Sequence, residues 1–95
     1  MMQTDREYAE ALFMLASEEN KTEEYLSSLL TFRELVEETP DYLEFLSSPA
    51  ISLQERLSAI DEAFGKDFDE YVVSFLKLLC ENGRIKTVNT AIDEY

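Results

Sequence analysis

The chain has 95 residues, of which 45% are hydrophobic and 31% charged, and its 21 acidic and 8 basic side chains give a formal net charge of −13. This length suits one domain with its own core. The acidic excess disfavours binding to nucleic acid or to an anionic membrane surface, because both need a cationic face. With only two glycines and two prolines, the composition favours an all-α fold over a β-rich one.

The first predicted helix covers residues 5–19, and the segment Thr4-Asp5-Arg6-Glu7 has the pattern of a capping box at its start. Its apolar side chains cover an arc of roughly 200° at about 100° per residue. A surface helix needs only about 100° or somewhat more to face a core. The apolar arc of this helix divides into two stripes. One is formed by Tyr8, Ala11, Leu12 and Leu15, and the other by Ala9, Phe13 and Ala16.

The second predicted helix begins at an N-cap, Thr22, and runs to about Glu38. Thr39 is then expected to cap a short third helix with Pro40 in its first turn, which stops before Pro49. The side chains expected in the core from the second helix are Tyr25, Leu26, Leu29, Leu30, Phe32 and Val36. The third helix is expected to run through Tyr42, Leu43, Phe45 and Leu46.

The fourth predicted helix follows a second capping box, formed by Ser52 and Glu55. Gly65 is expected to end it by adopting a positive φ, which glycine accepts without steric cost. The core side chains expected from this helix are Leu53, Leu57, Ile60 and Phe64.

The fifth predicted helix covers residues 68–82, with Asp67 as the expected cap and Asn82-Gly83 as the stop. A sixth helix is expected from Ile85 onwards. The apolar arc of the fifth helix is roughly 220° wide by the same rule of about 100° per residue, so this helix is either central to its bundle or keeps one face for a partner. The members of this arc are Tyr71, Val72, Val73, Phe75, Leu76, Leu78, Leu79 and Cys80.

Chemistry-bearing motifs are scarce. The chain has no histidine and one cysteine, so a disulfide within the chain is excluded and Cys80 is expected to be buried and unreactive. Neighbouring acids such as Glu37-Glu38 diverge by about 100° on a helix and do not converge on one reacting atom. Asp67-Phe68-Asp69 begins like a calcium loop, but the glycine and glutamate that such a loop needs later are absent. We therefore expect no catalytic residues, no cofactor and no metal.

No apolar run approaches the roughly 20 residues that span a bilayer, and the N-terminus lacks the apolar core of a signal peptide. These features predict a soluble, cytosolic protein without direct membrane insertion. The remaining functional signal is the apolar excess on the first and fifth helices. Facing each other, they could form a groove for an amphipathic helix, or both could simply be central in the bundle.

Three local sequences resemble one known family: YAEALF at 8–13, FLSSPAIS at 45–52 and FLKLLCENGR at 75–84. Together, and in this order, they resemble the N-terminal domain of the delta subunit of F-type ATP synthases, called the oligomycin-sensitivity-conferring protein in mitochondria. The resemblance covers essentially residues 1–95. It implies an all-α, compact six-helix bundle in a single domain.

The resemblance also implies a non-catalytic stator subunit that joins the catalytic head to the peripheral stalk during proton-coupled ATP synthesis. Its place would be the cytoplasmic side of the bacterial plasma membrane, as a peripheral part of the complex. In the family, the N-terminal helix of an alpha subunit lies across the first and fifth helices. By position, the expected partner-binding residues are Tyr8, Ala11, Leu12, Leu15, Phe75, Leu78, Leu79 and Asn82.

Family members continue into a second domain that engages the b-type stalk subunits, whereas this sequence ends at Tyr95. We therefore expect b-type subunits to bind a C-terminal domain that is missing here, and the isolated chain to be a monomer. The alternative is a free helical adaptor, or a homodimer that uses the same apolar faces for self-association.

Overall fold

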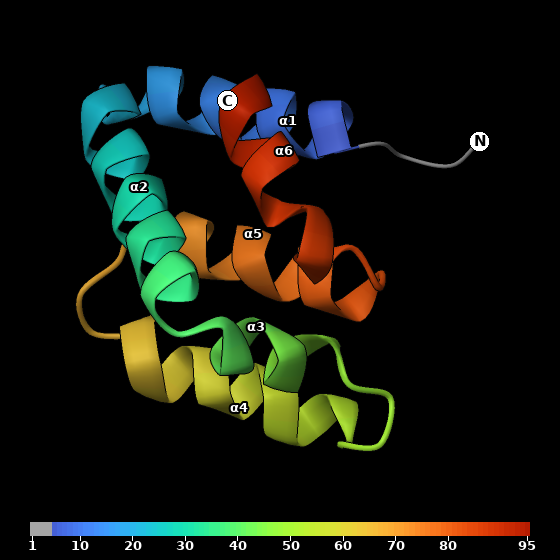
Figure 1. Ribbon diagram of the computed structural model, residues 1–95. Helices are drawn as coiled ribbons and strands as arrows, with labels where there is room; N and C mark the ends of the chain where they lie inside the picture. The colour runs from blue at the N-terminus through green and yellow to red at the C-terminus, as the bar shows by residue number, and fades with distance from the viewer. Residues whose placement is uncertain (1–4) are drawn as a thin grey trace.

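The computed structural model describes residues 5–95, which form six α-helices, one 3-10 helix and no strand (Figure 1). This confirms the all-α, six-helix prediction. The Cα radius of gyration is 12.5 Å, close to the roughly 13 Å of a compact 100-residue domain. In chain order the helices are α1 (Asp5–Glu18), α2 (Thr22–Glu38), α3 (Pro40–Ser47), α4 (Leu53–Phe64), α5 (Glu70–Glu81), η1 (Ile85–Thr87) and α6 (Val88–Glu94).

α5 occupies the middle of the bundle, between α1 and α6 on one side and α3 and α4 on the other (Figure 1). It contacts α1, α2, α4 and η1. This central position accounts for most of its wide apolar arc, because the larger part of that arc faces other helices. The buried residues of α5 are Val72, Val73, Phe75, Leu76, Leu79 and Cys80.

The core is centred on side chains from α2, α3, α4 and α5. Leu29, Phe32, Ile60, Leu76 and Leu79 are fully buried, as predicted, whereas Leu57 is only half-buried. Burying each such aliphatic or aromatic side chain contributes about 1.5–3 kcal/mol. The rings of Phe32 and Phe64 pack edge to face in this core, with their centroids 5.3 Å apart. This is a favoured geometry for aromatic pairs.

Three leucines predicted for the core lie at the surface instead. Leu26 and Leu30 on α2 are 39% and 42% exposed, and Leu53 at the start of α4 is 39% exposed. The buried row of α2 consists of Tyr25, Leu29, Phe32 and Val36. Leu26 and Leu30 each follow a member of this row by one residue, which rotates them about 100° out of the core.

The start of α5 also differs from the prediction. Asp69, not Asp67, is the N-cap, and its side chain accepts a hydrogen bond from the Tyr71 N–H at 2.9 Å. The backbone N–H groups of Asp67 and Phe68 both donate to the Phe64 carbonyl. Residues 64–68 therefore form a turn that closes α4, and α5 begins two residues later than expected.

The other helix ends follow the sequence signals only in part. Ser52 caps α4 as predicted and accepts from the Glu55 N–H at 3.2 Å. Thr22 is the first residue of α2 rather than its cap, and Thr39 precedes α3 as predicted but makes no side-chain capping bond. The first predicted capping box involves Thr4, which lies outside the described residues.

The two glycines have different roles. Gly65 has a φ of −58°, so the predicted positive φ is wrong there. A Cβ at this position would lie 2.5 Å from the Asp61 carbonyl oxygen, which explains the need for glycine. Gly83 has a φ of +69°. It ends α5 in a Schellman motif, in which the N–H of Gly83 donates to Cys80 and that of Arg84 to Leu79.

Candidate partner-binding surface

The eight predicted partner-binding residues divide into two groups in the structure. Tyr8, Leu12, Phe75 and Leu79 belong to the core, with exposed fractions between 0% and 7%. The exposed ones are Ala11, Leu15, Leu78 and Asn82. A partner can therefore reach the second group directly, whereas the first group supports the surface from beneath.

α1 buries one arc and leaves an apolar edge on each side of it. The buried arc is formed by Tyr8, Ala9, Leu12 and Ala16, so it takes members from both predicted stripes. At one edge, the ring of Phe13 lies 5.4 Å from that of Tyr95, which follows α6 directly. Ala11 and Leu15 lie at the other edge, because about 100° per residue places them on the opposite side of the buried arc.

α5 has the same organisation. At one edge of its buried face, the ammonium group of Lys77 lies 2.6 Å from a carboxylate oxygen of Asp61 on α4. Tyr71 and Leu78 lie at the opposite edge, again by the rotation of about 100° per residue. These two side chains are 37% and 38% exposed.

α1 and α5 contact each other. By elimination, we infer that the edge of α1 that faces away from α6 and the edge of α5 that faces away from α4 border this contact. We call this surface the α1–α5 seam and define it by Ala11, Leu15, Tyr71 and Leu78. Tyr71 is missing from the predicted set, although its spacing of seven residues from Leu78 places both on one helix face.

Asn82 lies at the end of α5, next to this surface. Its side-chain amide donates to the Leu78 carbonyl at 2.8 Å, and its backbone N–H closes the last turn. Its first role is therefore to end the helix. Glu7 and Glu18 on α1 are exposed and lie at spacings of four and seven residues from Ala11, so the edge of the seam on α1 is acidic.

Cys80 is buried, as predicted, and its thiol donates to the Leu46 carbonyl at 3.3 Å. Burial raises the pKa of this thiol, which keeps it protonated. Among residues 5–95, no group of three or more His, Cys, Asp or Glu side chains could hold a metal ion. None of the helices in this part of the chain combines the length and hydrophobicity needed to cross a membrane.

Comparison with protein families gives a match over residues 4–95 to the ATP synthase delta (OSCP) subunit. The chain belongs to this family. An ATP synthase subunit delta from Clostridium kluyveri is 34% identical over 90 residues, which cover 95% of this chain and 50% of the relative. One from Acetivibrio thermocellus is 33% identical over all of this chain and 53% of the relative. The chain thus spans about half the length of the curated relatives it matches.

Membership in the delta (OSCP) family confirms the resemblance carried by the three motifs. The structure places YAEALF on α1, FLSSPAIS at the connection between α3 and α4, and FLKLLCENGR at the end of α5 and the turn after it. The first and third motifs contribute Ala11 and Leu78 to the α1–α5 seam. The glycine of the third motif is the residue with positive φ that ends α5.

Proposed function

We propose that residues 1–95 are the N-terminal helical domain of an ATP synthase delta subunit, and that the α1–α5 seam binds the N-terminal helix of an alpha subunit. In this role the domain is a non-catalytic part of the stator, and it links the catalytic head to the peripheral stalk in proton-coupled ATP synthesis. The observation that carries the proposal is the set of three half-exposed apolar side chains on two neighbouring helices, Leu15, Tyr71 and Leu78.

An amphipathic helix is the partner that suits this surface. Burying apolar area releases about 25 cal/mol per Å², and helices dock into apolar surfaces through side chains spaced at i, i+3, i+4 and i+7. Ala11 lies between the larger side chains and leaves room for the backbone of the partner to approach. The acidic edge formed by Glu7 and Glu18 favours a partner helix with Lys or Arg on its rim.

The remaining attachments of the subunit belong to chain outside these residues. Because the curated relatives are about twice as long, we assign binding of the b-type stalk subunits to a C-terminal domain. The complex would hold this domain at the cytoplasmic side of the bacterial plasma membrane. There it would be a peripheral component, without inserting any of its described helices into the bilayer.

The substitution Leu78→Asp tests the proposed interface. A carboxylate at this position would lose water without gaining a partner when the helix docks, so binding of a synthetic alpha N-terminal peptide should be abolished in a fluorescence anisotropy titration. Circular dichroism and the melting temperature should remain nearly unchanged, because Leu78 is already 38% exposed.

Leu53→Asp is the matched control, since Leu53 is 39% exposed but lies on α4. It should bind the peptide like the wild type. Normal binding by a folded Leu78→Asp variant would show that the partner docks elsewhere. A mass measurement addresses the alternative, because a tight homodimer that Leu78→Asp dissociates would make the seam a self-association surface.

A further inference from the structure

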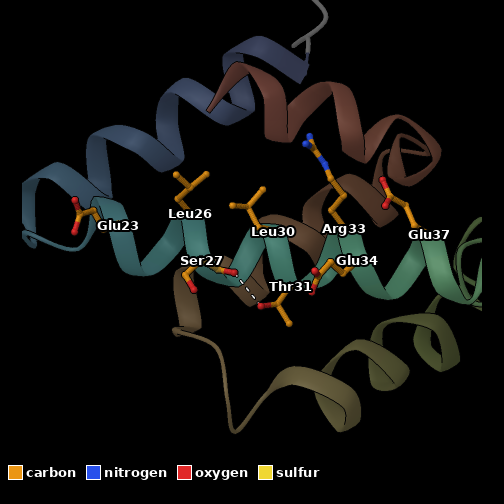
Figure 2. A pocket seen from close by; sticks show the side chains of 8 residues that line it. All are labelled: Glu23, Leu26, Ser27, Leu30, Thr31, Arg33, Glu34 and Glu37. Atoms are coloured by element: carbon orange, nitrogen blue, oxygen red, sulfur yellow. Dashed lines mark hydrogen bonds between the residues drawn. The ribbon is translucent and has the colours of Figure 1, made fainter.

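A second apolar surface lies on α2 and is not part of the α1–α5 seam. Leu26 and Leu30 are 39% and 42% exposed, and they are one helical turn apart. They line a surface depression along α2, together with Ser27 and Thr31 (Figure 2). Two large leucines on the outer face of a helix, in a chain of this charge, are unexplained by the packing of the bundle.

The depression borders α6. Arg33 lies in the same row of α2 as Leu26 and Leu30, as Figure 2 shows. Its guanidinium donates to the Asn89 carbonyl at 3.0 Å and to the Asp93 carboxylate at 2.6 Å. A second link joins the two helices, because the Tyr95 hydroxyl donates to the Thr22 carbonyl at 2.8 Å. We call this region the α2–α6 surface and define it by Leu26, Leu30, Arg33 and Asp93.

The charges around the α2–α6 surface are acidic. Glu23, Glu34 and Glu37 line the depression. Arg33 also lines it, and its guanidinium is already paired with Asp93. A second copy of this chain would bring an equally acidic rim, and an anionic lipid surface would be repelled in the same way. A partner with cationic side chains beside an apolar face would match both the leucines and the glutamates.

We propose that the α2–α6 surface binds a basic amphipathic helix, separate from the helix that occupies the α1–α5 seam. The depression extends along α2 from Glu23 to Glu37, and 14 steps of about 1.5 Å give it a length of about 21 Å. The occupant is therefore a helix of about four turns. Its apolar face contacts Leu26 and Leu30, and its Lys or Arg side chains pair with the glutamates on the rim.

The two surfaces are independent on geometric grounds. Leu26 and Leu30 are on the side of α2 that borders α6, whereas Ala11 and Leu15 are on the edge of α1 that faces away from α6. Substitutions at one surface therefore leave the other unchanged. Loss of binding at the α2–α6 surface can therefore be told apart from loss of binding at the α1–α5 seam.

The probe for this test is a 14-residue model helix with leucine on one face and lysine on both flanks. The matched peptide carries glutamate in place of lysine. We expect the lysine peptide to bind the wild-type chain in an anisotropy titration, more weakly at high salt, and the glutamate peptide not to bind. The double variant Leu26→Gln/Leu30→Gln should lose at least tenfold in affinity for the lysine peptide. Titrations of the variants are made in the Leu78→Asp background, in which the α1–α5 seam is closed to the peptide, and the control Leu53→Gln should lose less than threefold there.

A second variant keeps both leucines and reverses the rim. The double variant Glu23→Lys/Glu34→Lys should bind the lysine peptide with lower affinity, and this affinity should depend less on salt. A melting curve checks that the variant remains folded. Unchanged affinity of both double variants would overturn the proposal, as would equal binding of the two peptides. A wild-type dimer in sedimentation that Leu26→Gln/Leu30→Gln dissociates would also overturn it, because the occupant would then be a second copy.

Discussion

Asp69 joins parts of the chain that are distant in sequence. Its carboxylate accepts from the Tyr71 N–H at 2.9 Å and from the Tyr25 hydroxyl at 3.0 Å, and the Lys21 ammonium lies 3.4 Å away. The backbone bond to Tyr71 is the main cause that lowers the pKa of Asp69 below 3.8, and the bonds from Tyr25 and Lys21 act in the same direction. One side chain thus caps α5 and ties it to the start of α2.

Removing this carboxylate should destabilise the domain. Asp69→Ala loses an N-cap, which is worth about 1 kcal/mol, and leaves the hydroxyl of the buried Tyr25 without its partner, which costs about 1 kcal/mol more. We expect a loss of about 2 kcal/mol in urea unfolding. Asp67→Ala is the matched control and should change stability by less than about 0.5 kcal/mol. Equal losses would show that Asp69 is not the cap.

The same carboxylate predicts a pH dependence. Because its pKa is lower in the folded state than the ordinary value of 3.8, its contribution is complete above that value and is lost as the pH falls through the lowered pKa. The stability advantage of the wild type over Asp69→Asn should therefore be full at about pH 6 and shrink as the pH falls below 3.8. A constant difference across this range would contradict the assignment.

Cys80 should be chemically inert in the folded protein. Its thiol is buried against the Leu46 carbonyl, and burial raises its pKa. A water-soluble thiol reagent should label the folded chain at least about a hundredfold more slowly than the unfolded chain, since access requires opening of the core. Labelling of the folded chain within seconds would disprove this.

At the scale of helices, the sequence was most informative about which segments are helical and least informative about where they meet. Asp67 and Glu70 have the spacing of a capping box, so the local pattern favours Asp67 as the cap. The bonds from Tyr25 and Lys21, which are 44 and 48 residues distant in sequence, select Asp69 instead. The helical spacing of apolar residues in α2 likewise does not show that Leu26 and Leu30 lie outside its buried row.

The residues of the candidate site could also be predicted only in part from the sequence. Periodicity identified α1 and α5 as over-wide in apolar surface, but most of the excess on α5 proved to be core. Which edge of each helix remains exposed depends on the neighbours, namely Tyr95 beside α1 and Asp61 beside α5. Tyr71 could have been found from its spacing to Leu78. Leu79 was expected both in the core and in the partner-binding set, and the packing of the bundle shows that it is fully buried.

Two leucines of α5 test this description of the helix. Leu76 is fully buried and Leu78 is 38% exposed. Leu76→Ala should cost about 2–5 kcal/mol of unfolding free energy through lost burial and a residual cavity. Leu78→Ala should cost less than about 1 kcal/mol. Similar losses in chemical denaturation would mean that the rotational phase of α5 is wrong.

At the scale of the whole molecule, residues 5–95 present one apolar surface along the α1–α5 seam and another along α2 beside α6, and Phe13 and Met14 are exposed on α1 as well. Acidic side chains outnumber basic ones by 21 to 8, which gives the net charge of −13. Such a charge disfavours self-association and favours cationic partners. The two surfaces would allow one small domain to hold two helices at the same time.

We propose the α1–α5 seam as the docking site for an alpha N-terminal helix. The most direct measurement is a titration of isotope-labelled domain with that peptide, followed by amide chemical shifts. We predict that the largest changes occur at Ala11, Leu15, Tyr71 and Leu78, with little change around Leu53 on α4. Changes concentrated on α4, or no change at a saturating peptide concentration, would show that the seam is not the docking site.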